Sequence, residues 1–122
     1  MEIEIKKISN TDITKINFGN EKDEDTNELT GTIELDIENQ IPFLEQINSL
    51  LDEGVSKIIL TLSQISYIDS SGLWAIFESF KKAEQRNGKI ILLSPRKDVR
   101  RVLDITKISS KIKIFEEDES AI

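Results

Sequence analysis

Two nearly continuous apolar runs with an amphipathic segment between them constrain the fold of this chain most strongly. The runs cover residues 55–62 and 89–94, and such runs are typical of central strands that are covered on both faces. The segment between them predicts a helix that ends at 87–88, with one apolar face formed by Leu73, Ile76, Phe77, Phe80 and Ala83. Because the joints are short, the two strands are expected to be parallel and joined by a right-handed crossover.

Other periodic segments predict an edge hairpin and a further strand–helix unit upstream. Strands are expected at 2–8 and 12–18, with a turn between them, and at 31–37, where Ile33, Leu35 and Ile37 alternate. The helix that follows has Pro42 in its first turn and Gly54 at its end, and its apolar face comprises Phe43, Leu44, Ile47, Leu50 and Leu51.

The C-terminal part predicts one more helix and a short strand. The helix starts at Pro95 and turns Val99, Val102 and Leu103 inward, and the strand covers 111–115. The whole pattern predicts an α/β fold in which helices pack against a mixed central β-sheet. Without internal repeats or a composition break, residues 1–122 are expected to form a single domain.

The composition excludes several classes of chemistry. The chain has no cysteine and no histidine, so disulfides, zinc–thiolate sites, cysteine nucleophiles and an internal Ser-His-Asp triad are excluded. Neither glycine-rich phosphate-binding pattern occurs, and no pair of carboxylates is fixed in one pocket by the sequence. We therefore expect no cofactor, no metal and no enzymatic activity.

Charge and hydropathy limit the partners. The net charge of −7 argues against non-specific binding to nucleic acid or to anionic lipid. No apolar run approaches the roughly 18 residues that would span a bilayer, and the N-terminus does not resemble a secretory signal. We expect a cytoplasmic protein that neither enters a membrane nor binds nucleic acid.

The acidic segment 19–28 is expected to be an exposed loop. Asp23, Asp25, Asn27 and Glu34 fall at positions 1, 3, 5 and 12 of a calcium-binding loop, but position 6 is Glu28 instead of glycine. The flanks also predict strands instead of helices. A solvated loop is therefore favoured over a calcium site.

The stretch S-Y-I-D-S-S-G-L-W-A, residues 66–75, joins the first apolar run to the second helix. Asp69, Ser70 and Ser71 all suit the N-cap of a helix, so the simplest interpretation is that one caps and the others are idle. Gly72 costs about 0.5–1 kcal/mol relative to alanine in a helical turn, which suggests that another backbone comes close or that the turn is unusual. A serine at a helix N-terminus can also carry a phosphate, because the dipole and free N–H groups tolerate the charge.

The sequence I-S-Y-I-D-S-S-G-L resembles the signature of the STAS domain, in particular of bacterial anti-sigma factor antagonists. The likeness covers most of the chain, including 54–73 and 87–106, and L-D-I-E-N at 35–39 is similar to an earlier strand end. D-S-S-G-L is the specific element of the match, and the other segments are weaker.

The resemblance implies a function in partner switching. Such antagonists bind an anti-sigma factor that is also a GHKL-type serine kinase, and binding frees a sigma factor. The kinase phosphorylates the serine after the motif aspartate, here Ser70, and a PP2C-type phosphatase reverses this. The implied partner surface comprises Asp36, Asp69, Ser70, Ser71, Gly72 and Trp74, with Ser71 as the helix cap.

The chain departs from the family pattern in several places. Trp74 stands where the family has a glycine or another small residue, and it lies off the stripe of Leu73 and Phe77, which favours a partner contact. The I-E-L-D sequence replaces G-E-L-D, loop 19–28 resembles an insertion, and the family's final helix is cut short at Ile122. The alternative function is a STAS subunit with a structural role in a lipid ABC-transport complex or a stressosome-like assembly.

Overall fold

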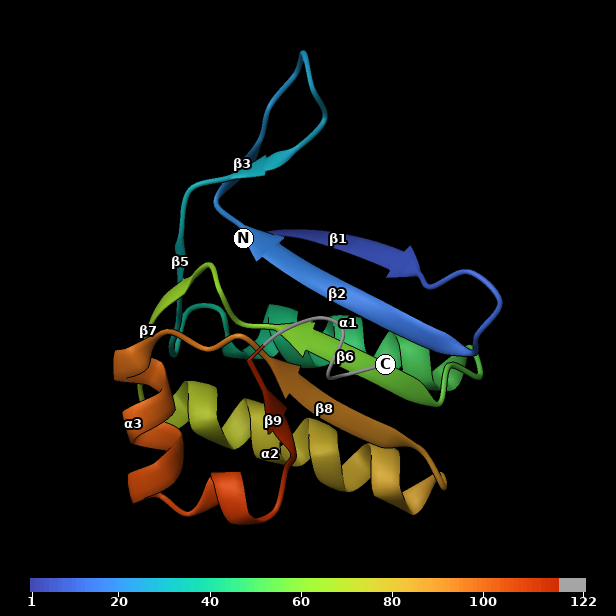
Figure 1. The fold of residues 1–122 in the computed structure, drawn as a ribbon, viewed down its shortest axis with the longest axis vertical. Helices are drawn as coiled ribbons and strands as arrows, with labels where there is room; N and C mark the ends of the chain where they lie inside the picture. Colours follow the sequence, from blue (N-terminus) through green and yellow to red (C-terminus); the bar gives the residue numbers. More distant parts are fainter. Residues whose placement is uncertain (117–122) are drawn as a thin grey trace.

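A five-stranded mixed β-sheet forms the centre of the computed structural model, which describes residues 1–116 (Figure 1). In spatial order the strands are β1 (Glu2–Lys7), β2 (Ile13–Gly19), β6 (Lys57–Thr61), β8 (Lys89–Leu93) and β9 (Ile114–Phe115). The first pair is antiparallel and the three others are parallel. The predicted α/β fold, with its mixed sheet and edge hairpin, is confirmed.

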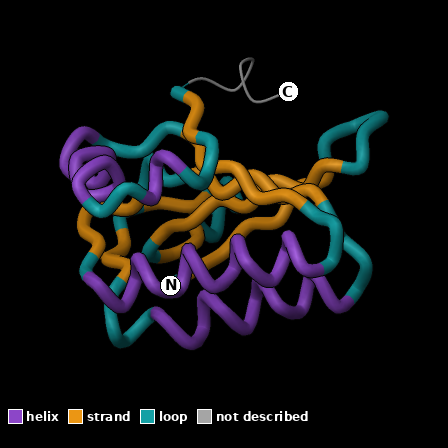
Figure 2. Tube along the Cα trace, turned by 90° about the horizontal axis from the view of Figure 1, so that it is seen from below, coloured by secondary structure: helices purple, strands orange, loops and turns teal. Residues whose placement is uncertain are grey.

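Two long helices lie side by side on one face of the sheet (Figure 2). They are α1 (Gln40–Asp52) and α2 (Ser70–Gln85), and each follows the carboxyl end of a strand. The core between helices and sheet includes a stacked pair of rings, Phe18 on β2 and Phe43 on α1, with centroids 5.7 Å apart. Ile58, Ile59 and Leu60 of β6 are all buried, so the expected central strand covered on both faces is confirmed.

The shorter elements complete the described chain. Helix α3 (Lys97–Ile105) contacts strand β7 (Ile65–Ile68) and leads into the 3₁₀ helix η1 (Ile108–Ser110). Its Val99 and Leu103 are buried as expected. No helix within residues 1–116 is long and apolar enough to cross a membrane. The shortened final helix expected near Ile122 concerns residues outside this described range.

A second, small sheet is formed by part of the segment 31–37, which was predicted as one strand, and by residues 65–68, for which no strand was predicted. Strand β5 (Ile33–Leu35) pairs in parallel with β7 (Ile65–Ile68). The prediction that the strand continues to Ile37 is wrong, since β5 ends at Leu35, and Ile37 is 67% exposed. The strand stops because the Asp36 carboxylate accepts hydrogen bonds from the backbone N–H groups of Glu38 and Asn39, which turns the chain into α1.

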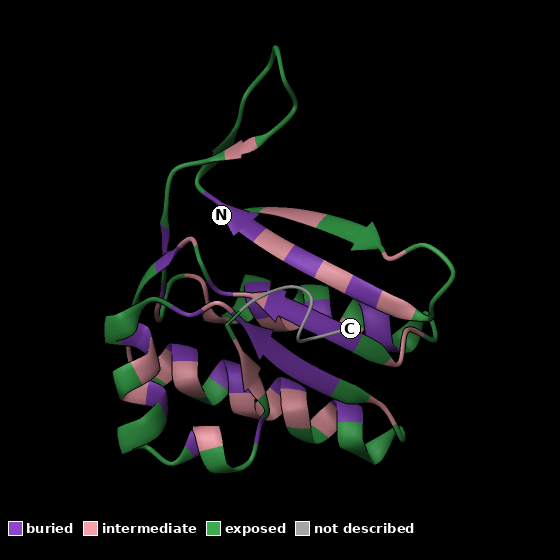
Figure 3. Ribbon diagram, viewed as in Figure 1, coloured by how far each residue is buried: buried purple, intermediate pink, exposed green. Residues whose placement is uncertain are grey.

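The acidic segment 19–28 was expected to be an exposed loop, and residues 20–28 are exposed, but the segment belongs to a protruding hairpin (Figure 3). Strands β3 (Glu21–Lys22) and β4 (Leu29–Thr30) form its base, and its tip is exposed. At the tip, the Asp23 carboxylate accepts hydrogen bonds from the N–H groups of Thr26 and Asp25, which hold its pKa below the usual value. Across residues 1–116, no group of three or more acidic, histidine or cysteine side chains could hold a metal ion.

The buried face of α2 differs from the predicted stripe. Small residues dominate it, namely Gly72, Ala75, Ser79 and Ala83, together with Ile76. Leu73, Phe77 and Phe80 are only half-buried. Leu73 and Phe80 still pack against the core as expected, whereas Phe77 does not. Helices whose contact residues are small approach their neighbours closely, which leaves Phe77 at the flank of α2. The predicted core role of Phe77 is therefore wrong.

Candidate functional site

The first turn of α2 is capped by Asp69. Its Oδ1 accepts hydrogen bonds from the N–H groups of Ser71, at 2.9 Å, and Gly72, at 3.1 Å. Ser71 was expected to be the cap, and this expectation is wrong, because it donates its backbone N–H to Asp69 instead. Within the described part of the chain, neither serine hydroxyl has a hydrogen-bond partner. The helix start is therefore complete without the side chains of Ser70 and Ser71.

Ser70 is the first residue of α2 and is exposed to solvent. A helix N-terminus concentrates partial positive charge and unpaired N–H groups, which favour an anion. The Ser70 hydroxyl is thus accessible to solvent and forms no hydrogen bond within the described part of the chain. Its position at the helix N-terminus stabilises added negative charge. These properties suit an acceptor of a phosphate group.

Gly72 allows the backbone of β5 to come close to α2. A Cβ atom at this position would lie 2.1 Å from the carbonyl oxygen of Leu35 and 2.9 Å from Cγ1 of Ile68. The same Leu35 oxygen accepts a hydrogen bond from the Asp69 N–H at 3.3 Å. The close approach suggested by the sequence is confirmed, and it fixes the start of α2 against the end of β5.

This contact also brings Asp36 to the same end of the molecule. Asp36 follows Leu35, so the turn into α1 lies beside the start of α2. The Asp36 carboxylate is occupied by its own turn. Two apolar side chains nearby in the chain remain exposed, Ile37 by 67% and Ile41 by 53%. The exposure of Ile37 was not predicted, because this residue continues the alternating apolar pattern of β5. Hydropathy alone does not show that a strand ends early.

An apolar groove of about 320 Å³ opens beside Ser70. Leu73, Trp74 and Phe77 of α2 line one side. The other side is formed by Ile108 with Lys107 and Lys111. Trp74 is 47% exposed, in agreement with its predicted position off the core. The sequence did not indicate the lysines, since they join this groove only through the packing of η1 near α2.

Loss of the Asp69 cap is expected to weaken the fold measurably. Asp69→Ala leaves the N–H groups of Ser71 and Gly72 without their acceptor and should lower the free energy of unfolding by about 1 kcal/mol. Asp69→Asn keeps an acceptor oxygen and should retain most of that stability. Urea titration of both variants and of Ser71→Ala measures the difference. A loss in Ser71→Ala equal to that in Asp69→Ala would contradict the assignment of the cap.

Comparison with known proteins gives the family of the fold and its relatives. Residues 21–121 match the STAS domain. The chain is 36% identical over 90 residues to a Thermotoga neapolitana protein named "Putative anti-sigma factor antagonist TM1081 homolog". The aligned residues cover 73% of this chain and 80% of that protein. The resemblance drawn from D-S-S-G-L is thereby confirmed.

Solved structures share the architecture over nearly the whole chain. A crystal structure from Thermotoga maritima, of a protein given the same antagonist name, superposes with a TM-score of 0.78 at 26% identity, covering 98% of this chain and 90% of that one. The unphosphorylated form of the anti-sigma factor antagonist SpoIIAA superposes with a TM-score of 0.66 at 19% identity, over 98% and 93% of the two chains. The Bacillus SpoIIAA structure has also been solved in a phosphorylated form, with a TM-score of 0.65.

Proposed function

The chain belongs to the STAS domain family, and on this basis we propose that it is an anti-sigma factor antagonist switched off by phosphorylation of Ser70. In its unphosphorylated form it binds an anti-sigma factor that is also a serine kinase, and a sigma factor is released. The relatives named as antagonists support the activity. The free, exposed hydroxyl of Ser70 at the start of α2 is the observation that supports the switch.

The surroundings of Ser70 favour a phosphorylated form that stays folded. The cap of α2 uses Asp69, and the Ser70 hydroxyl has no hydrogen-bond partner among residues 1–116, so phosphorylation removes no hydrogen bond of this described range. The added charge of about −1.5 to −2 meets the positive end of the helix dipole. Lys107 and Lys111 line the same groove as Ser70 and contribute further positive charge.

The same charge is expected to disrupt a protein interface. Trp74 and the groove residues beside Ser70 provide an apolar surface, and a partner packed there would have to desolvate the phosphate. Burial of a phosphate costs several kcal/mol unless all of its charge is matched, and the exposed Lys107 and Lys111 would have to lose their water as well. A tenfold loss of affinity requires only about 1.4 kcal/mol. One phosphate is therefore sufficient, and a large rearrangement of the fold is not needed.

In this proposal the partner supplies the chemistry. The chain has no histidine or cysteine, so the GHKL-type kinase provides ATP, metal and base, and a PP2C-type phosphatase removes the phosphate. The protein itself would have neither catalytic activity nor a cofactor, and it would act in the cytoplasm, where sigma factors are found. Asp36, Asp69, Ser71 and Trp74 would form the partner surface around Ser70. Gly72, also expected there, is buried against β5 and would support this surface from below.

Phosphate transfer to Ser70 tests the proposal. Incubation of the chain with the anti-sigma factor kinase of its host and Mg-ATP should add one phosphate, which mass spectrometry should locate on Ser70. Ser71→Ala should accept the phosphate and Ser70→Ala should not. The chain without kinase should remain unmodified. Transfer to Ser71 alone, or no transfer at all, would contradict the assignment.

A further inference from the structure

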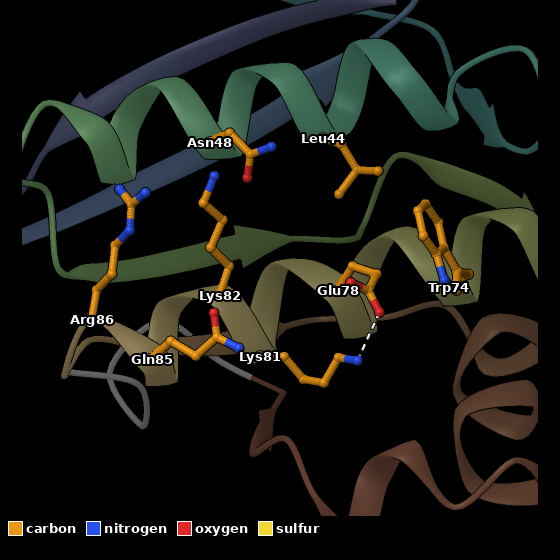
Figure 4. A pocket seen from close by; sticks show the side chains of 8 residues that line it. All are labelled: Leu44, Asn48, Trp74, Glu78, Lys81, Lys82, Gln85 and Arg86. Atoms are coloured by element: carbon orange, nitrogen blue, oxygen red, sulfur yellow. Dashed lines mark ion pairs between the residues drawn. The ribbon is translucent and has the colours of Figure 1, made fainter.

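A second groove of about 550 Å³ runs along the outer surface between α1 and α2 (Figure 4). Leu44 of α1 and Trp74 of α2 lie opposite each other at one end. Lys81, Lys82 and Arg86 lie toward the other end, on α2 and just after it. From Trp74 to Arg86 the groove follows 12 residues of chain, or about 18 Å of helix. It thus changes from apolar to cationic along its length.

The positive charge in this groove is unusual for such an acidic chain. Among the residues that the structure describes, three cations line it against one acid, Glu78, although the chain as a whole carries −7. Lys81 pairs with Glu78 at 2.8 Å, and Arg86 pairs with Asp52 beside the groove, where it lowers the pKa of Asp52. Lys82 forms no ion pair within residues 1–116 and extends across the groove toward α1 (Figure 4).

These cations are available to a partner. Both ion pairs lie at the surface, with side chains 33–59% exposed. Such pairs contribute little net stability, so exchange of their carboxylates for those of a partner costs little. Across most of its surface the chain would repel an acidic partner, whereas this groove would attract one. Charge complementarity of this kind fixes the orientation of a complex and accelerates association.

We propose that the groove between α1 and α2 binds an acidic amphipathic segment of the partner protein, with its apolar residue between Leu44 and Trp74 and its carboxylates against Lys82 and Arg86. This inference rests on the proposed function for the identity of the partner. The length of the groove accommodates about three helical turns, and a helix laid on two neighbouring helices is a common mode of peptide recognition.

The groove is also continuous with the surface around Ser70. Trp74 lines both the groove between α1 and α2 and the apolar groove beside Ser70. A partner bound at the phosphorylation site can therefore also contact Trp74 and, further along α2, the cationic end of the groove. The cationic end of the groove is thus a second contact for the partner, and phosphorylation of Ser70 does not alter it.

Charge reversal in the groove tests the inference with the full chain and the host's anti-sigma factor kinase. Lys82→Glu/Arg86→Glu should weaken the complex by tenfold or more in calorimetry and should reduce its dependence on salt. Lys7→Glu/Lys22→Glu changes the net charge equally on β1 and the protruding hairpin and should weaken it less than threefold. Equal melting temperatures of the two variants exclude a folding defect. If the groove variant binds as wild type while phosphorylation of Ser70 still abolishes binding, the groove proposal is wrong and the proposed function stands.

A crosslink separates the groove from the identity of the partner. A photoreactive phenylalanine derivative at Gln85, in the groove, should capture in the host a segment rich in Asp and Glu with an apolar residue, whereas the same group at Thr26 on the hairpin should not. Capture of a second copy of this chain, of a segment without excess acidic residues, or of nothing would overturn the proposal. If the anti-sigma factor kinase does not bind the wild type at all, the proposed function fails, and the composition of the crosslinked segment still decides whether the groove takes an acidic partner.

Discussion

Gly72→Ala should destabilise the protein by about 3 kcal/mol, near the upper end of the usual cost of overpacking. The added methyl group would lie 2.1 Å from the Leu35 carbonyl oxygen, so either β5 or the start of α2 must shift. Leu35 cannot move without stretching its hydrogen bond with the Asp69 N–H. The higher helix propensity of alanine recovers only about 0.5–1 kcal/mol, which is much less than the cost of the clash.

Thermal unfolding measures this effect. At about 4 °C per kcal/mol for a chain of this size, the melting temperature should fall by roughly 12 °C. Ser71→Ala is the matched control, because it alters the neighbouring residue in the same turn without adding an atom, and it should melt within about 2 °C of wild type. A Gly72→Ala variant that melts together with this control would show that β5 and α2 do not approach each other as described.

Ser70→Asp should lose at least tenfold in affinity for the anti-sigma factor kinase and still fold. Ser70 is exposed and its hydroxyl holds no structural hydrogen bond in the described chain, and a carboxylate at the start of a helix is favourable to the fold. The melting temperature should therefore stay within a few degrees of wild type. Ser70→Ala cannot be phosphorylated and should bind the kinase permanently, so the sigma factor stays free.

The appropriate control for added charge is Asn27→Asp at the tip of the protruding hairpin. It adds one negative charge at a position with φ of 61°, which aspartate tolerates, far from α2 in the fold (Figure 1). If Asn27→Asp weakens binding as much as Ser70→Asp, the effect follows from net charge and not from the position of Ser70. If Ser70→Asp unfolds, its loss of binding reports on stability.

The sequence predicted the sheet and its crossovers because long apolar periodicities specify them. The runs that form β6 and β8 are almost uniformly apolar, and such a run is by itself typical of a central strand. Strand β7 was missed because it is only four residues long and pairs with β5 outside the main sheet. Short strands of this kind are stabilised by tertiary contacts, which periodicity does not reveal.

The sequence predicted which residue types form the site, but it did not predict the role of each residue. Asp69, Ser70 and Ser71 are nearly equivalent as caps by propensity. The structure assigns the cap to Asp69 because the extended backbone of that residue directs its carboxylate toward the N–H groups of the first turn. Gly72 was recognised through its unfavourable helix propensity, but the carbonyl that requires it comes from β5, some 37 residues away in the chain.

The groove surfaces could not be read from hydropathy at all. Phe77 lies on the predicted apolar stripe and still ends up half-buried at the flank of α2, because small residues occupy the closest contact. Lys107 and Lys111 approach Ser70 only through the path of the chain after α3. Surfaces assembled from segments so distant in the sequence depend on packing, which the periodicity of one segment does not contain.

The affinity of the anti-sigma factor kinase for the chain with and without phosphate on Ser70 tests the central claim most directly. Both forms are titrated by calorimetry, and their melting temperatures are recorded in parallel. We expect the phosphorylated form to bind at least tenfold more weakly and to melt within a few degrees of the unphosphorylated form. Equal affinity of the two forms would contradict a switch at Ser70.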